Sequence, residues 1–350
     1  MSLTTTCIGA YPKPGYVRLP DWFNLPAGPD TSNPTRFWLE AMEALGSGAP
    51  AIIERGIREA ISDQVACGID IPTEGEIARE NYIHYHCRHL NGIDFENLTE
   101  KAVRGGNYSA DLPSIVSPVS MKKSYIADDW RRAQSMTSRP VKITLPGPMT
   151  VGDTTADLFY HDPVKRGSAL AEALNEEVLS LADAGCRHIQ IDEPVFARQP
   201  GNALAFGFEN LEKAFHGCPR QVMRTVHICC GYPDRLDHPN YPKADLDAYN
   251  RIADAIEESS IDTVSLEFAH RPGNLSLLEH FKTTRVIFGA VAIAKSRVET
   301  VEEIREHLGR ALKHIDAERL LVAPDCGLGL LDRKCAMQKL RNMSEAARSL

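Results

Sequence analysis

Four side chains of metal-ligating type occupy equivalent places in the second half of this 350-residue sequence. Each lies at or just past a short apolar run typical of a β-strand, in TVHICCG, TVSLEFA and LLVAPDCGLG. Taken singly, each cysteine is more typical of a small buried hydrophobe, so the interpretation depends on the four together. Thiolate and imidazole suit Zn²⁺ better than Mg²⁺ or Ca²⁺, which prefer oxygen. The pattern therefore predicts a zinc site made of His227, Cys229, Glu267 and Cys326.

Carboxylates follow two other apolar runs and are candidates for binding a cationic group. Asp192 and Glu193 come directly after HIQI, and Glu76 follows GIDIP at the end of TEGE. At the end of a buried strand such carboxylates can take the ammonium of an amino acid, and Asp192 can also act in catalysis by positioning a proton donor. Two structural alternatives stay open: Glu193 could pair with an arginine, and Glu76 could cap the helix that follows it.

A second cluster of ligand-type residues, His84, His86, Cys87 and His89, is less typical of a metal site. On a helix, positions 84 and 86 point in different directions, and only pairs such as 86 and 89 share a face. We expect a packing or solvated role for this cluster. Cys230 follows Cys229 directly and would point to the opposite side of a continuing strand, so we leave it out of the zinc shell.

The elements that position these residues form a regular repeat from Val141 onward. Six β-type runs alternate with helical stretches, and this alternation predicts a parallel sheet. The runs are VKITL, HIQID, VMRTVHI, TVSLEF, RVIFGAV and LLVAP; helices are expected at 165–184, near 205–216, around 245–258, at 301–315 and from about Arg333. Leu170, Leu174, Val178 and Leu181 form the inward stripe of the first of these helices.

Two upstream runs, TTCIGA and GIDIP, complete the pattern. Between them a helix at 50–68 is expected to bury Ile53, Ile57, Ile61 and Val65. Eight strands predict an α/β fold, a single (β/α)₈ TIM barrel over residues 1–350, with its chemistry at the carboxyl ends of the strands. The segments near 11–50 and 92–140 fit the repeat poorly, so we interpret them as long loop insertions at the barrel ends, with a hairpin at 98–117.

Composition narrows the classes of partner and location. The 47 acidic and 39 basic residues give a net charge of -8 without blocks of like charge, which argues against nucleic acid and anionic membranes as partners. Neither a leader pattern nor an apolar run of about 18 residues occurs, so we expect a cytoplasmic protein. The nine scattered cysteines are unlike a disulfide framework and should be reduced. The oligomeric state cannot be derived from the sequence.

Several of these motifs carry a resemblance to a known family. CIGAYPKP, TEGE, LPGPMT, IQIDEP, VHIC, VSLE and PDCGL occur in the order and spacing of the catalytic barrel of the cobalamin-independent methionine synthases. The chain resembles the short members that have this barrel alone. The resemblance implies zinc held by His227, Cys229, Glu267 and Cys326, with Glu76 and Asp192 anchoring the amino group of homocysteine. Zinc would replace the thiol proton, and the incoming sulfur would exchange with a weak carboxylate ligand.

The sequence departs from the family pattern at three places. Ala10 stands where a serine usually helps to hold the amino acid carboxylate. Thr154 stands near the position of a tryptophan that stacks on the pterin, and Ala292 and Ala294 replace an aspartate and a proton-donating histidine. These departures weaken the case for methyltetrahydrofolate, so the methyl donor of a homocysteine S-methyltransferase could be a folate or a methylated corrinoid.

Three other functions remain open at this point. A zinc-dependent transferase that opens an epoxide with a thiol such as coenzyme M would use the same thiol activation. The related uroporphyrinogen decarboxylase barrels need no metal, and would not call for His227, Cys229 and Cys326 together. A non-catalytic paralogue that keeps zinc for structure would have a closed four-ligand site without an adjoining pocket.

Overall fold

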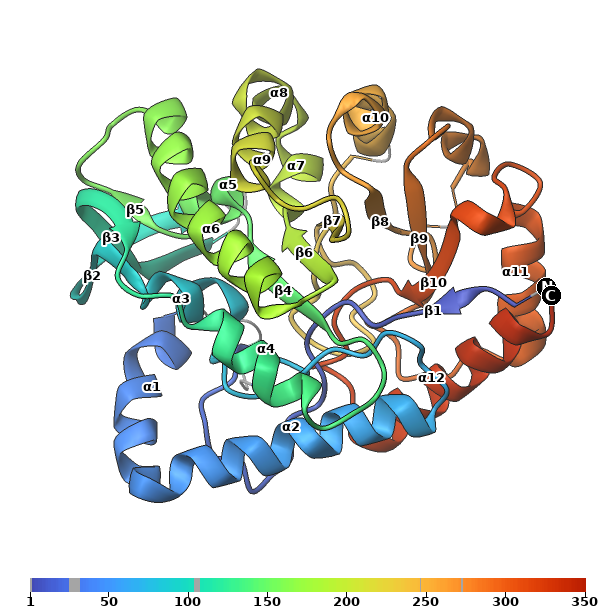
Figure 1. Ribbon diagram of the computed structural model, residues 1–350, viewed down its shortest axis with the longest axis horizontal. Helices are drawn as coiled ribbons and strands as arrows, with labels where there is room; N and C mark the ends of the chain where they lie inside the picture. The colour runs from blue at the N-terminus through green and yellow to red at the C-terminus, as the bar shows by residue number, and fades with distance from the viewer. Residues whose placement is uncertain (1, 25–31, 104–107, 246, 272) are drawn as a thin grey trace.

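The computed structural model describes residues 2–24, 32–103, 108–245, 247–271 and 273–350 (Figure 1). Its central element is a curled sheet in which the described strands all pair in parallel, in the order β1-β10-β9-β8-β7-β6-β4. Because the strands are parallel, their carboxyl ends share one edge. The strands are β1 (Thr4–Thr5), β4 (Lys142–Pro146), β6 (His188–Asp192), β7 (Met223–Ile228), β8 (Thr263–Glu267), β9 (Arg285–Val291) and β10 (Leu320–Pro324).

The two upstream runs form less strand than the sequence predicts. Of TTCIGA (residues 5–10) only Thr5 belongs to a strand, β1 (Thr4–Thr5). GIDIP (residues 68–72) and the residue after it make isolated parallel bridges, Ile71 with Thr6 and Thr73 with Lys142. The Asp70 carboxylate accepts the Thr5 N–H at 3.0 Å, so a side chain here takes the place of a ladder partner. The described residues therefore show a curled parallel sheet of the α/β class, and the bridges lie between its two edge strands, β1 and β4.

Helices cover the outer face of this sheet, as Figure 1 shows. α6 begins after Asp162, whose carboxylate accepts the N–H groups of residues 164 and 165, and it ends at Gly185 in the left-handed region (φ 103°). Its predicted inward stripe is buried, and in α2 the three isoleucines are buried while Val65 is half-buried. The predicted helices are α2 (Ala49–Ala66), α6 (Pro163–Ala184), α9 (Phe208–Ala214), α10 (Ala248–Glu258), α11 (Val301–Ala311) and α12 (Arg333–Arg348).

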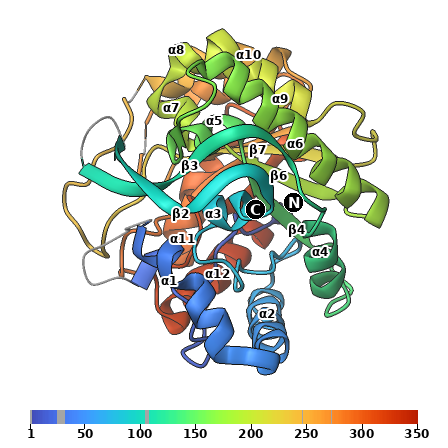
Figure 2. The same cartoon turned by 90° about the vertical axis from the view of Figure 1, so that its left-hand side faces the viewer.

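The two segments interpreted as loop insertions contain regular structure. The predicted hairpin is present and longer than expected: β2 (Leu90–Val103) pairs antiparallel with β3 (Tyr108–Met121) (Figure 2). The short strand β5 (Ala156–Asp157) pairs in parallel with β3. Residues 104–107, inside the predicted hairpin, lie outside the described residues. The helices that we did not predict in these segments are α1 (Ser32–Leu45) and α4 (Ile126–Gln134), and a further helix that we did not predict, α3 (Tyr82–Cys87), lies between the two segments.

A distant contact explains why α4 escaped prediction. The Glu177 carboxylate on α6 accepts the N–H groups of Tyr125 and Ile126 at 3.2 and 3.3 Å, and so satisfies donors at the start of α4 from another helix. No local pattern encodes such a cap.

The remaining elements are short. They are α5 (Pro148–Asp153), α7 (Pro194–Arg198), α8 (Pro200–Asn202), the 3₁₀ turns Trp22–Asn24, Gly46–Gly48, Leu275–His280 and Ala317–Arg319, and the π-helical turn Ala203–Gly207. Among the described helices, none is long and apolar enough to cross a membrane.

Candidate metal centre

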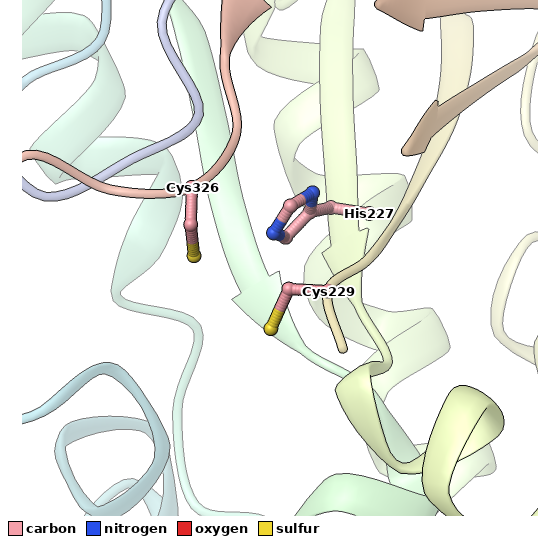
Figure 3. Close-up of side chains that lie close together, drawn as sticks. All are labelled: His227, Cys229 and Cys326. Carbon is pink, nitrogen blue, oxygen red and sulfur yellow. The ribbon is translucent and has the colours of Figure 1, made fainter. Parts of the chain in front are cut away.

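Three of the four predicted zinc ligands meet at the carboxyl edge of the sheet (Figure 3). His227 lies in β7, Cys229 follows that strand directly, and Cys326 follows β10. One ligand atom from each of the three lies within 4.8 Å of the others. Strands β8 and β9 separate β7 from β10, so the meeting of residues almost a hundred positions apart depends on the curl of the sheet.

The histidine of this group has a free ring nitrogen. His227 is 2% exposed, and its Nδ1 lies 3.0 Å from the Ser265 hydroxyl. Its Nε2 is buried and has no hydrogen-bond partner among the described residues. A buried polar atom without a partner costs about 1–3 kcal/mol, and a cation at Nε2 would remove that cost. Ser265 accepting from Nδ1–H would select the tautomer whose Nε2 lone pair can bind metal.

The two thiols interact with each other. Contact with Cys326 lowers the pKa of Cys229 well below its ordinary value, against the effect of burial, and nearby His227 acts in the same direction. Contact with Cys229 raises the pKa of Cys326. The pair thus favours one thiolate and one thiol. A divalent cation would replace the remaining proton, so the residues present fit a zinc ion.

Glu267, the fourth predicted ligand, is held outside this group of three. It ends β8, and its Oε1 accepts the N–H of Cys230 at 2.9 Å. Its Oε2 forms an ion pair with the Lys243 ammonium at 2.5 Å. Burial raises the pKa of Glu267 to about 7, and Lys243 opposes the rise. Ligation of zinc by Glu267 stays a prediction; Cys230, as expected, is not among the three converging residues.

A second group of ligand type, Glu267, His270 and Asp325, has its hydrogen-bonding capacity in use. The Asp325 carboxylate accepts the backbone N–H groups of residues 268–270 and contacts the His270 Nδ1 at 2.7 Å. The His270 Nε2 accepts the N–H of Ala294 at 3.0 Å. This network connects the ends of β8, β9 and β10. It also places a histidine beside Ala294, with its Nε2 acting as an acceptor.

The candidate substrate carboxylates Glu76 and Asp192 line one cavity of about 400 Å³ with the metal group. Gln190 donates to Asp192 at 2.7 Å, and burial raises the Asp192 pKa to about 6, against the effect of His227. Thr144 donates to Glu76 at 2.8 Å, and burial raises the Glu76 pKa to about 7. Glu76 has φ 56°, a left-handed backbone conformation that costs a non-glycine residue about 1–3 kcal/mol and is common at functional sites.

Sequence reasoning missed Arg79, the residue that holds Glu76 in place. Its guanidinium forms ion pairs with Glu74 at 2.6 Å and Glu76 at 3.7 Å, and donates to the Thr144 carbonyl at 3.0 Å. The Arg79 side chain is only 4% exposed. A signal was present: an arginine three residues after Glu76 with two acids before it could have suggested a buried ion pair.

Glu193 serves a helix end. Its carboxylate accepts the N–H groups of Met149 and Thr150 and the Thr150 hydroxyl, at 2.7 to 3.0 Å, and so caps α5. A Cβ on Gly147 would lie 2.2 Å from the Glu193 carboxyl carbon, so only glycine allows this approach. The arginine pairing considered from the sequence is not among the described contacts, and substrate binding by Glu193 stays a prediction.

The cavity continues from the metal group toward an aromatic wall. Ala10 lines it beside the candidate ligands, so this wall position carries a methyl group and no hydroxyl. A pocket of this kind next to the three converging ligands is unlike the closed site expected for purely structural zinc. The aromatic residues of the wall are Trp22, Phe23, Tyr82 and Tyr232.

The three members of the histidine cluster that lie on α3, His84, His86 and Cys87, are buried, as a packing role requires, and His89 after the helix is half-buried. His84 lies between the Thr35 hydroxyl at 2.5 Å and the Thr154 carbonyl at 2.9 Å, and burial lowers its pKa to about 4. His86 contacts the Tyr125 hydroxyl at 3.0 Å, and burial lowers its pKa to about 3. Both side chains are buried and neutral, and neither belongs to a metal-type group among the described residues.

Comparison with known proteins identifies the family of this chain. Residues 34–209 and 244–349 match the family model described as the catalytic domain of cobalamin-independent synthase. The chain belongs to the cobalamin-independent methionine synthase family. Methionine synthase from Pyrococcus furiosus is 27% identical, over 99% of this chain and 93% of that protein. Methionine synthase from Saccharolobus solfataricus is also 27% identical, over 99% and 94%.

Two solved structures of cobalamin-independent methionine synthases are also similar to this chain. A B12-independent methionine synthase from Shewanella sp. W3-18-1, in complex with selenomethionine, is 31% identical, with a TM-score of 0.86 over 99% of this chain and 97% of that one. A putative vitamin-B12 independent methionine synthase from Listeria monocytogenes is 15% identical with a TM-score of 0.73, and supports the fold alone.

Proposed function

We propose that the protein is a zinc-dependent methyltransferase that transfers a methyl group to homocysteine. The observation that carries the proposal is the buried Nε2 of His227, without a hydrogen-bond partner among the described residues, in a group with the thiols of Cys229 and Cys326 that lines a cavity. The methionine synthases from Pyrococcus furiosus and Saccharolobus solfataricus, similar over nearly their whole lengths, support this reaction. The two bridges at Ile71 and Thr73 support a closed (β/α)₈ barrel spanning residues 1–350 as the scaffold.

In this proposal one set of side chains binds the metal and another binds the substrate. His227, Cys229 and Cys326 hold the metal, and Ser265 orients the His227 ring at 3.0 Å. When bound, zinc would supply the positive charge that keeps a substrate thiol deprotonated at neutral pH. The ammonium of homocysteine would lie against the cavity carboxylates Glu76 and Asp192.

The carboxylates are suited to an ammonium ligand. Burial alone disfavours their charged forms, and their pKa values stand at about 7 for Glu76 and about 6 for Asp192. A nearby cation favours the ionised form of each. Binding of the amino acid would therefore compensate two desolvated acids, while Arg79 keeps Glu76 aimed at the cavity.

The donor is proposed to be a folate or a methylated corrinoid, and the local contacts favour a donor with a good leaving group. Thr154 has no aromatic ring to stack on a pterin, and its hydroxyl donates to the Thr150 carbonyl at 2.8 Å. Ala294 has no proton to give, and the neighbouring His270 uses its Nε2 to accept the Ala294 N–H. An epoxide-opening thiol transferase would use the same metal ligands, whereas the open cavity argues against a non-catalytic paralogue.

The test is Cys326→Ser, measured by metal content and by thiol methylation with a panel of methyl donors. We expect the wild type to bind about one zinc per chain at its single predicted site. We expect the variant to lose methylation of homocysteine while keeping its fold. Cys218→Ser is the matched control, because Cys218 is half-buried and is not part of the cavity lining. Zinc-free wild type with full activity would overturn the proposal, and activity only with an epoxide would replace homocysteine methylation by the alternative.

A further inference from the structure

We propose that Lys243 is a latch for Glu267: it binds this carboxylate when a substrate thiol takes the fourth position on the metal, and it competes with zinc for the carboxylate when no thiol is present. This inference rests on the proposed zinc function. It assigns a positioning role to a lysine that the sequence did not single out. The observation behind it is the ion pair itself, in which the predicted fourth ligand is held by an ammonium at 2.5 Å.

The backbone around Lys243 is fixed against the end of β7. The N–H of Ala244 donates to the Cys230 carbonyl at 2.7 Å. Gly231 has φ 147°, and a Cβ there would lie 2.5 Å from the Pro242 carbonyl oxygen. The chain therefore doubles back tightly behind the metal ligand Cys229. This backbone packing places the Lys243 side chain beside the Glu267 carboxylate.

The Glu267 carboxylate needs a cation beside it, whether that cation is the Lys243 ammonium or the proposed zinc. The side chain is 2% exposed, so removal of its partner would leave a buried charge. Breaking a buried ion pair by removing one partner costs about 3–5 kcal/mol. The Cys230 N–H satisfies Oε1 alone, at 2.9 Å. Two cations can satisfy Oε2: the ammonium of Lys243, as observed, or the proposed zinc.

The Lys243 ammonium can be stabilised both when it binds Glu267 and when it does not. Its side chain is 19% exposed, so it is partly hydrated, and the ammonium lies 4.9 Å from the centroid of the Tyr241 ring. Cation–π contact and water can stabilise the ammonium when the carboxylate is on the metal. The pair thus permits exchange of Glu267 between two cations without leaving a buried charge alone.

The latch has two opposite consequences for affinity. Without Lys243 the carboxylate has one cation left to bind, so zinc should bind more tightly. A thiol that must displace Glu267 from zinc would then leave the carboxylate without a partner, so homocysteine should bind more weakly. A role in simple folding stability would produce neither the opposite signs nor a dependence on Glu267.

The experiment is a double-mutant cycle with Lys243→Met, Glu267→Gln and the combined variant. Zinc dissociation constants come from competition with a chelator, and homocysteine dissociation constants from titration of each zinc-loaded protein. We expect Lys243→Met to tighten zinc binding by about tenfold and to weaken homocysteine binding by a similar factor, the scale found for partners of metal ligands. In the Glu267→Gln background, Lys243→Met should change neither constant by more than about twofold.

Two control variants complete the design. Lys213→Met removes a lysine that also pairs with a glutamate, Glu172 at 3.5 Å, outside the cavity lining, and should change neither constant. Lys243→Arg keeps a cation beside Glu267, so both dissociation constants should stay close to the wild-type values. This variant can also be measured if Lys243→Met does not fold.

The outcomes separate the latch from the metal site. Unchanged zinc affinity in Lys243→Met, or the same change in the Glu267→Gln background, would reject the latch and leave the zinc site intact. Failure of the wild type to bind zinc would overturn both the latch and the proposed function.

Discussion

Replacing Arg79 by methionine should destabilise the metal-free protein strongly. Arg79 is 4% exposed and neutralises two buried acids, Glu74 at 2.6 Å and Glu76 at 3.7 Å. It also satisfies the carbonyl and hydroxyl of Thr144 at 3.0 and 3.1 Å. Methionine would fill much of the space and leave both carboxylates without their counter-ion.

The magnitude follows from the burial of the ion pairs. Removing one partner of a buried pair costs about 3–5 kcal/mol, because the remaining charge is desolvated without compensation. We expect a loss of this size in the free energy of unfolding, measured by urea denaturation at pH 8. Arg58→Met is the matched control: Arg58 pairs with Glu54 at 2.9 Å but is 56% exposed, so its loss should cost at most about 1 kcal/mol.

The cost should also depend on pH, with a defined sign. The Glu76 pKa is raised by burial to about 7 from an ordinary value of 4.5, and loss of Arg79 removes an interaction that lowers it. A carboxyl with a raised pKa in the folded state stabilises the fold at low pH, and this contribution is lost as pH rises through the folded pKa. The deficit of Arg79→Met should therefore be smaller at pH 5.5 than at pH 8. A deficit below about 1 kcal/mol at pH 8, or one that does not shrink on acidification, would refute the reasoning.

Two further predictions concern the methyl donor and the buried histidines. Methyltetrahydropteroyl-triglutamate should react with homocysteine about a hundredfold or more slowly than a methylated corrinoid, because Ala294 supplies no general acid and Thr154 no stacking surface; efficient steady-state turnover with the folate would contradict this. The His86 pKa is lowered by burial to about 3 from 6.5, so its contribution to stability is present above pH 6.5 and is lost as pH falls toward 3. Between pH 6.5 and 4.5 the wild type should lose about 1.4 kcal/mol per pH unit relative to His86→Gln, measured by urea denaturation, and parallel pH curves for the two proteins would contradict it.

Local sequence pattern predicts most of the sheet and its outer helices. LLVAP is a short apolar run that ends at a polar residue, HIQID alternates polar and apolar residues, and the stripe of α6 recurs at helical spacing, so neighbouring residues carry the signal. The two upstream runs were overestimated, because the Asp70 side chain supplies a partner that the strand pattern assigned to backbone. The helix α4 was missed because its cap, Glu177, comes from α6.

The candidate site was predictable to the extent that strand ends place it. His227, Cys229 and Cys326 converge because each lies at the same edge of a curled parallel sheet. The partners of the carboxylates were not predictable in this way. Arg79 and Lys243 lie outside the strand–helix repeat, and their contacts with Glu76 and Glu267 depend on how the loops fold back onto the sheet.

The most direct test of the zinc-thiol chemistry is X-ray absorption at the zinc edge, before and after homocysteine is added to the zinc-loaded protein. Coordination by Cys229 and Cys326 predicts two sulfur neighbours at about 2.3 Å in the substrate-free protein. Binding of the substrate through its thiol predicts a third sulfur at a similar distance. A sulfur count that stays at two under saturating homocysteine would contradict thiol activation at this centre.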